Sequence, residues 1–392
     1  MAVQTITVAN AAELNQALAS ATGGETILLA AGDYGALNVN GMQYASDVTI
    51  KSADPNAMAS FSTASLYNSS HITFDTIKFD YNFASGDKYY NSPFKVESSN
   101  NITFANSLFD GDTAHSTGTA ADGLGISKGL FVNGSSDINV VGTEFHSWWT
   151  ALSVINGQDV HIAGNNIHDI RSDGIKLNNL DNTLVENNYI HDFSGTDALS
   201  DHRDMIQVQR PQGDGVTNLT IRDNVFDMGS GSWTQTIWMG VDKANGNDPT
   251  NWHSNVLIEN NVIYNSHTHG ISINLTHNLS IRKNSVIRVR SAKSGGVSIP
   301  AIRVSPNSTS VVIERNTVSK ISGYKNQRDW VVLNNALIQD TSPSAPGYYD
   351  REFIYHATGS SHGYHEYGVR PGSAIDQLNA GSALVKNYPT RR

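Results

Sequence analysis

The segment Asp201-His202-Arg203-Asp204 places two carboxylates, an imidazole and a guanidinium within four residues. Such groups can take up a proton near neutral pH, balance a negative charge and donate a proton. Removing the proton beside a sugar carboxylate requires three groups: a base, a cation or metal for the enolate-like charge, and an acid for the leaving oxygen. We predict that Lys176, His202, Arg203 and Asp204 provide this chemistry.

Three aspartates, Asp173, Asp201 and Asp204, are candidates for a Ca²⁺ site, because hard cations prefer oxygen ligands. The same carboxylates could instead lower the acidity of neighbouring cations. An aspartate before a strand also often closes a turn by accepting from backbone amides, which is the alternative for Asp173. The alternative for the charged segment 201–204 is a solvated surface loop with Arg–Asp pairs.

These groups belong to a repeat that is marked by asparagine. An aliphatic residue precedes a repeated asparagine by three positions in six units: Asn165, Asn188, Asn224, Asn261, Asn284 and Asn316. Asn165 and Asn188 are 23 residues apart, as are Asn261 and Asn284, so the unit is short and longer units carry insertions. Thr143 and Ser107 occupy the same position in weaker upstream units.

Each unit contains at least two short strands with alternating residues, as in Ile175-Lys176-Leu177 and Ile206-Gln207-Val208. Units of this length cannot bury an apolar face alone and must stack. We found no helical periodicity within the units, so the pattern predicts an all-β parallel β-helix. Its asparagines are expected to form an inward ladder of amides bonded to turn backbone.

Composition narrows the class of protein. The chain has no cysteine, a formal net charge of −10 and no long apolar run, which excludes a disulfide scaffold, a nucleic-acid-binding charge balance and a membrane span. We predict a monomer with one β-helix over residues 1–325, a capping helix at about 10–24, and an irregular cover or arm over 326–392. The first residues lack the pattern of a conventional signal peptide.

One column of residues should face outward on successive coils: Lys95, Phe131, Ser153, Lys176, Gln207, Trp238, Ser272 and Arg303. Cations, an amide and aromatic rings in a line suit an extended anionic chain of sugars. Long insertions before and after this column mark it as the binding side. The residues predicted to bind substrate are Lys95, Asn178, Gln207, Gln209, Arg210, Trp238, His269 and Arg303.

Glu25-Thr-Ile-Leu-Leu-Ala-Ala-Gly-Asp-Tyr34 after the first helix, the repeated Asn-Asn-x-Ile-His-Asp and Asp173-Gly-Ile-Lys-Leu177 resemble the pectate-lyase-like family of right-handed parallel β-helix proteins. The resemblance covers residues 1–325 and implies that fold. Within the family the chain is most similar to secreted bacterial polysaccharide lyases, mannuronan C5-epimerases and rhizobial-type glycanases. That implies an extracellular protein acting on an acidic polysaccharide, although the Gly-Gly-x-Gly-x-Asp repeats of such proteins are absent.

Four motifs resemble, in register, those of the family's polygalacturonase-type hydrolases: Ser172-Asp173-Gly174, Arg203-Asp204, Thr268-His269-Gly270 and Ile302-Arg303-Val304. Arg203 replaces one aspartate of the hydrolase pair, and direct-displacement hydrolysis needs two or three carboxylates around a water. The epimerase motif Asp-Pro-His-Glu is also absent. We therefore expect a lyase that acts by β-elimination. A hydrolase or an epimerase acting on the same substrate class is the alternative. The competing class is a non-catalytic carbohydrate-binding solenoid.

Overall fold

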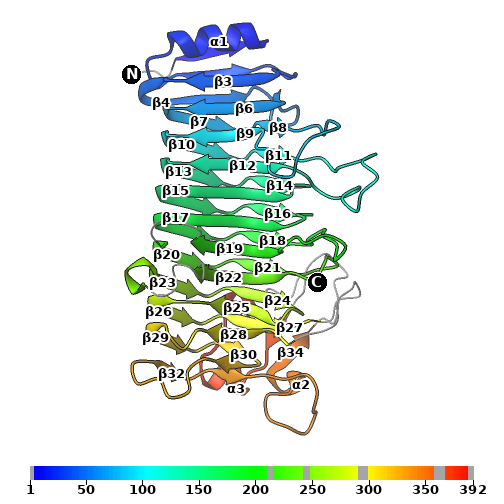
Figure 1. The fold of residues 1–392 in the computed structure, drawn as a ribbon, viewed down its shortest axis with the longest axis vertical. Coiled ribbons are helices and arrows are strands. Elements are labelled where there is room, and N and C mark those ends of the chain that lie inside the picture. The colour runs from blue at the N-terminus through cyan, green and yellow to red at the C-terminus, as the bar shows by residue number, and fades with distance from the viewer. Residues whose placement is uncertain (1–3, 211–214, 242–247, 290–298, 357–366, 387–392) are drawn as a thin grey trace. The chain divides into compact units, whose positions relative to one another are not determined.

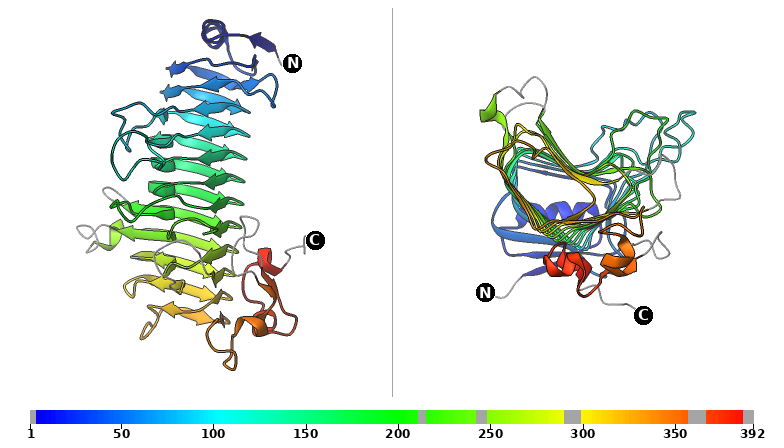
Figure 2. Two further views of the ribbon diagram at one scale, coloured as in Figure 1. Left: turned by 90° about the vertical axis from the view of Figure 1, so that its right-hand side faces the viewer. Right: turned by 90° about the horizontal axis from the view of Figure 1, so that it is seen from below.

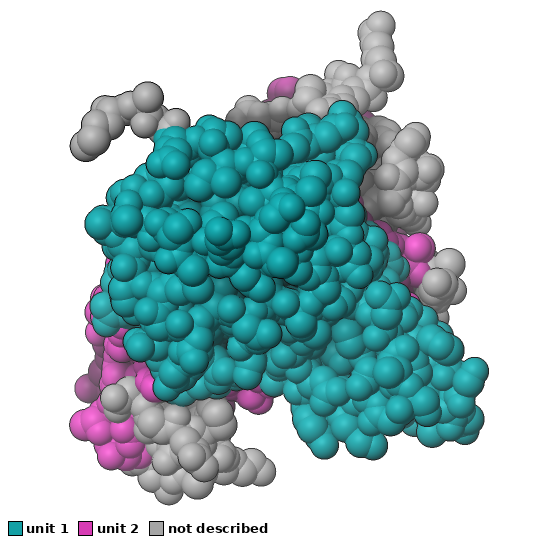
Figure 3. All heavy atoms as spheres, turned by 90° about the horizontal axis from the view of Figure 1, so that it is seen from above, with its two compact units in different colours: residues 1–175, 196–200 teal, residues 176–195, 201–392 magenta. Residues whose placement is uncertain are grey.

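The computed structural model describes residues 4–210, 215–241, 248–289, 299–356 and 367–386. The chain divides into two compact units (Figure 3). Unit 1 comprises residues 1–175 and 196–200, and unit 2 comprises residues 176–195 and 201–392. Each is a stack of short parallel strands (Figure 1).

Unit 1 begins with strand β1, which pairs in parallel with β2 of the next coil. Its elements are β1 (Thr5–Val8), α1 (Ala11–Ser20), β2 (Thr26–Leu29), β3 (Ala36–Asn40), β4 (Gln43–Ser52), β5 (Ser60–Phe61), β6 (Thr63–Tyr67), β7 (Ser70–Asp75), β8 (Lys78–Asp80), β9 (Phe94–Glu97), β10 (Asn100–Ala105), β11 (Leu108–Asp110), β12 (Lys128–Asn133), β13 (Ser136–Val141), β14 (Glu144–His146), β15 (Thr150–Ala163) and β16 (Asn166–His168). Strand β17 (Asp173–Glu186) begins in unit 1 and lies mostly in unit 2.

Unit 2 continues with the same kind of coil and ends in mixed short elements. These are β18 (Tyr189–His191), β19 (Asp204–Arg210), β20 (Thr217–Arg222), β21 (Val225–Asp227), β22 (Gln235–Val241), the 3-10 helix η1 (Pro249–Asn251), β23 (His253–Glu259), β24 (Val262–Asn265), β25 (His269–Ile273), β26 (Thr276–Arg282), β27 (Ser285–Arg288), β28 (Ala301–Val304), β29 (Thr309–Glu314), β30 (Thr317–Val318), β31 (Ile321–Ser322), β32 (Val331–Leu333), β33 (Ala336–Leu337), α2 (Tyr349–Glu352), β34 (Phe353–His356), β35 (Tyr367–Val369), α3 (Ala374–Gln377) and α4 (Ala383–Lys386).

Helix α1 covers the first coils of unit 1 (Figure 1). Its N-cap Asn10 accepts a hydrogen bond from the Glu13 backbone N–H at 3.0 Å, and Glu13 accepts one from the Ala9 N–H at 2.8 Å. This exchange satisfies amides that have no partner within the helix. Leu14, Ala17 and Leu18 are buried. The helix predicted at about 10–24 therefore spans residues 11–20.

Inward side chains stack from coil to coil. In unit 1, Phe109 stacks between Phe79 and Phe145 with ring centroids 4.4 and 4.6 Å away, and all three rings are buried. Parallel pairing in exact register puts the same kind of residue at the same position of successive coils. The core is thus a set of columns, as the alternating pattern predicts.

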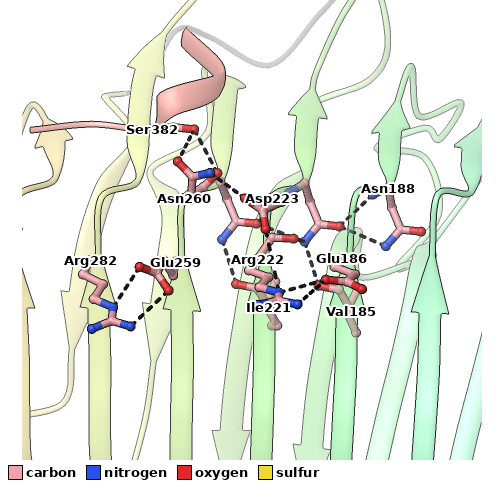
Figure 4. Close-up of polar contacts among 12 residues, drawn as sticks. Val185, Glu186, Asn188, Ile221, Arg222, Asp223, Glu259, Asn260, Arg282 and Ser382 are labelled. Carbon is pink, nitrogen blue, oxygen red and sulfur yellow. Dashed lines mark hydrogen bonds and ion pairs between the residues drawn. The ribbon is translucent and has the colours of Figure 1, made fainter. Parts of the chain in front are cut away.

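The asparagine ladder is confirmed in unit 2, and Figure 4 shows its first rung, Asn188. Each rung's side-chain nitrogen donates to the side-chain oxygen of the next rung at 2.9–3.0 Å, in the order Asn188, Asn224, Asn261, Asn284, Asn316 and Asn335. The preceding residue takes the left-handed conformation, as at Asn187 and Asn260, which asparagine tolerates better than most residues. In unit 1 the Ser107 N–H donates to Thr143 Oγ1 and the Thr143 N–H to Asn165 Oδ1, so these weaker matches also hold.

Parallel pairing extends beyond residue 325, because β32 pairs with β29 and β33 with β30. The segment that follows is more regular than the sequence suggested, because its described residues, 338–356 and 367–386, form three short helices and the antiparallel pair β34–β35. Its apolar residues, among them Tyr349, Phe353 and Tyr367, pack against Tyr264 and Ile287 of unit 2. Figure 2 shows the orange and red helices of this segment beside the last coils. It is therefore a lateral cover. No helix of the described residues is long and apolar enough to cross a membrane.

Candidate functional site

The outward column exists within each unit. In unit 1, Lys95 pairs with Phe131 and Phe131 with Ser153. In unit 2, Gln207 pairs with Trp238, Trp238 with Ser272, and Ser272 with Arg303, on strands β19, β22, β25 and β28. The polar groups that converge by hydrogen bonding lie on this second set of strands.

The centre of the site is Asp204 at the start of β19. Its side chain is fully buried, and its Oδ2 contacts His202 Nδ1 at 2.8 Å and accepts a hydrogen bond from Gln207 Nε2 at 2.8 Å. Gln207 is 2% exposed, so the expectation that it faces solvent is wrong. The reason is that a buried carboxylate needs donors, and the Gln207 amide, three residues further along the chain, supplies one. Ser153, also expected outside, is buried as well.

Gln235, which the sequence reading did not single out, connects two histidines. It begins β22, directly opposite Asp204. Its Nε2 lies 3.0 Å from His202 Nε2, and its Oε1 forms a short contact with His269 Nδ1. The signal that could have identified it is its register, one coil after Asp204 in the same position.

This bridge assigns the protons on both imidazoles. An amide nitrogen only donates, so His202 Nε2 is the acceptor and Nδ1 carries the proton that faces Asp204. The amide oxygen only accepts, so His269 Nδ1 carries a proton and its lone pair is on Nε2. Asp204, His202 and Gln235 together therefore hold His269 in the tautomer of a base.

Electrostatics keep His269 uncharged. Burial is the main cause that lowers its pKa, and the nearby Arg303 guanidinium lowers it further, while Asp204 acts in the opposite direction. Burial, followed by the interaction with the neighbouring His269 ring and nearby cations, lowers the pKa of His267 to about 3. The His267 and His269 ring centroids are 5.1 Å apart. A neutral imidazole beside a cation is thus present at neutral pH.

The indole ring of Trp238 forms a flat surface beside His202. A Cβ atom added at Gly240 would overlap the indole ring, so the ring lies over the glycine on the outer face of β22. Its centroid is 6.0 Å from that of His202. Indole faces pack well against the apolar faces of sugar rings.

Arg303 also lines a cavity of about 450 Å³ at the beginning of strands β25, β28 and β31. Lys320 is a second cation in its wall, and Thr268, Ser319 and Gln339 add polar groups. Asp340 lines the cavity too, but its carboxylate pairs with Arg288 at 2.9 Å. Two cations at one cavity suit an anionic ligand.

Other predicted site residues have different surroundings. Arg203 Nε donates to the Trp233 carbonyl at 2.8 Å, which fixes the loop before β19. Lys95, in unit 1, pairs with Glu97 at 3.1 Å. Lys176 is partly exposed on β17.

The flanking residues are only partly described. The Asn178 amide faces the backbone carbonyls of Leu177 and Gln209, at 2.7 and 3.1 Å once its nitrogen is turned toward them. Gln209 itself is partly exposed, and the side chain of Arg210 lies outside the described residues.

The calcium prediction has limited support. Asp173 is buried in unit 1, whereas Asp201 and Asp204 belong to unit 2. The described residues contain no group of three or more His, Asp or Glu side chains placed to hold a metal ion. Asp204 Oδ1 and Gln207 Oε1 are buried acceptors without a hydrogen bond among these residues, and oxygen atoms of this kind suit a cation. Two such atoms are fewer than the roughly six to eight oxygen ligands that Ca²⁺ takes. Calcium stays a prediction.

The right-handed β-helix region family matches residues 124–339, which is more than half of the chain. The comparison with curated proteins gave no match. The surface adhesin PfbA of Streptococcus pneumoniae is a similar solved structure, with 13% identity, a TM-score of 0.52 and coverage of 92% of this chain and 94% of that one. The PL6 family alginate lyase AlyGC is another, with 12% identity, a TM-score of 0.53 and coverage of 97% of this chain and 57% of that one. At such identities the likeness concerns the fold.

Proposed function

We propose that this chain, which belongs to the right-handed β-helix family, cleaves an acidic polysaccharide by β-elimination at its site on β19, β22, β25 and β28. Solved structures with a similar fold include a polysaccharide lyase and an adhesin. The observation that carries the proposal is the neutral His269, held with its Nε2 lone pair available and close to Arg303. A base beside a cation is the combination that proton removal next to a carboxylate requires.

In the proposed reaction, His269 Nε2 removes the C5 proton of a uronate residue. Arg303 pairs with the sugar carboxylate and stabilises the negative charge that develops there. The electron pair of the C5–H bond forms the C4–C5 double bond, and the C4–O bond breaks. The leaving oxygen takes a proton from water. Lys176, the acid predicted from the sequence, lies on β17, three strands of about 4.8 Å each before β25, which is too far from His269 for both groups to act on one bond.

His202 and Asp204 then act indirectly. The sequence suggested that they transfer protons, but Asp204 is buried and the Gln235 amide occupies the Nε2 position of His202. We infer that both residues orient Gln235, and that Gln235 orients His269. Trp238 provides the surface for a neighbouring sugar ring, and Lys320 a second charge partner for the polymer.

Hydrolysis is the weaker alternative. Direct displacement needs two carboxylates around one water, whereas the hydrogen-bonded cluster of His202, Asp204, Gln207, Gln235 and His269 has one carboxylate, and that one is buried. We also propose that the protein works outside the cell, where a long polysaccharide can reach its site. We propose further that it acts as a monomer.

The test is incubation with polymannuronate, polyguluronate and polygalacturonate while the absorbance of unsaturated uronate is followed. A rise supports β-elimination, new reducing ends without that absorbance indicate a hydrolase, and gel retention alone indicates a binding protein. His269→Ala should reduce turnover by about 10²-fold or more, as expected for loss of a general base. His277→Ala is the matched control, because that histidine hydrogen-bonds Thr309 and the Pro249 carbonyl and is not part of the cluster.

A further inference from the structure

We propose that unit 1 has a second carbohydrate-binding site, built on the loop of residues 81–93, that accepts an uncharged sugar. The loop connects β8 with β9 and is much longer than the connection between β14 and β15. It leads directly into the strand that carries Lys95, so it borders the outward column of unit 1. The inference does not depend on the reaction proposed for unit 2.

The loop is held by its own polar groups. Asp87 accepts hydrogen bonds from the Tyr81 hydroxyl at 2.7 Å, the Ala84 N–H at 2.9 Å and the Asn91 amide at 3.2 Å. Tyr81 is buried, and its ring lies 5.5 Å from that of Trp148. A loop ordered in this way presents its side chains in fixed positions, which lowers the entropy lost on binding.

Two tyrosines project from the ordered loop. Tyr89 and Tyr90 are 48% and 58% exposed, and their rings meet edge to face with centroids 5.2 Å apart. Tyr89 also lies 4.7 Å from the Trp149 ring. Large apolar side chains gathered at the surface of a rigid loop usually mark a ligand site. Aromatic faces of this kind bind the C–H faces of sugar rings.

A cavity of about 490 Å³ adjoins the same loop. Its walls combine hydroxyl, amide and carboxylate groups: Ser62, Thr63, Tyr81, Asn82, Asp87, Asn91 and Ser92, with Pro93. The volume is within the range of small-molecule sites. Asp87 and Asn91, which line the cavity, flank the two tyrosines in the chain. The two rings therefore belong to the segment that forms part of the cavity wall, although neither ring lines the cavity itself.

Charge distinguishes this cavity from the one in unit 2. Its lining residues include one carboxylate, Asp87, and no lysine or arginine, whereas Arg303 and Lys320 line the other cavity. Lys88 is the cation of the loop, and it is exposed beside Tyr89 and does not line the cavity. Carboxylates and amides bind sugar hydroxyls by accepting and donating hydrogen bonds, but a carboxylate repels a uronate. The chemistry therefore favours a neutral sugar, as part of a mixed polymer or of a separate glycan.

The test is native affinity electrophoresis of the full chain in gels containing glucomannan, xyloglucan, galactan or polygalacturonate. We expect at least one neutral polymer to retard the protein, and Tyr89→Ala/Tyr90→Ala to weaken that binding by about tenfold or more, as for loss of aromatic anchors. Asn82→Ala should weaken it too, without removing a ring. Tyr67→Ala is the matched control, since Tyr67 is 51% exposed in unit 1 and lies outside the loop, at the opposite end of β6 from the cavity residue Thr63.

The proposal is wrong if no neutral polymer retards the protein, if the double variant binds like the wild type, or if Tyr67→Ala has an equal effect. Thermal melting confirms that each variant is folded. Turnover on short oligouronates is measured alongside, because the tyrosine variants should retain it. His269→Ala should lose this turnover while a neutral polymer still retards it as strongly as the wild type. That result would show that the two sites are separate.

Discussion

Replacing Gln235 by leucine tests the hydrogen-bonded chain that positions His269. Gln235 is 7% exposed, and leucine has a similar volume, so packing is largely kept while both contacts to imidazoles are lost. Two hydrogen bonds at a net value of about 0.5–1.5 kcal/mol each predict a loss of roughly 1–3 kcal/mol in stability. Turnover should fall by about 10- to 100-fold, because His269 would no longer be restricted to one tautomer and one orientation.

The assays are unsaturated-uronate release and denaturant unfolding. Gln235→Glu is the informative companion: its carboxylate can accept from both imidazoles, and its charge raises the pKa of His269. That variant should recover turnover at higher pH, which a purely structural role of Gln235 would not produce. Gln158→Leu, at an exposed position of unit 1, should change neither quantity. Wild-type turnover in Gln235→Leu, together with an inactive His269→Ala, would refute the proposed positioning.

Three further predictions concern the scaffold, the pH profile and the aromatic surface. Asn261→Ala should destabilise the protein by roughly 2–6 kcal/mol in denaturant titrations, because its buried side-chain oxygen accepts two hydrogen bonds whose donors would each lose about 1–3 kcal/mol. Since the pKa of His269 is lowered, activity should be kept above that pKa and lost as pH falls through it, with the acid midpoint of kcat/KM below the ordinary histidine value of 6.5. Arg303→Ala, which removes a cause of the lowering, should move that midpoint to higher pH, and an unmoved midpoint would exclude His269 as the base. Gly240→Ala should raise KM several-fold with a smaller change in kcat, because the added Cβ displaces the Trp238 ring.

The sequence by itself determined the coil, its register and its ladder. The repeat of Asn188 and its counterparts, spaced by 23 residues where no insertion intervenes, can be read directly, because a repeat with fixed side-chain periodicity leaves little choice of pairing. The same register correctly aligned Gln207 with Trp238 and Ser272 with Arg303. The roles that we propose for His269 and Arg303 also follow positions which that register identified.

The tertiary structure decided which of these outward residues meet. Alternation places Gln207 on the outer face, but only the folded loop of residues 201–203 and the buried Asp204 show that this face is covered there. Gln235 was missed because a bridging role depends on the direction of two side chains, His202 in the loop before β19 and His269 at the start of β25, and periodicity gives no such direction. The sequence left the C-terminal segment as either a cover or an arm for a related reason. Its apolar residues follow no repeat, so only packing against Tyr264 and Ile287 shows where they lie.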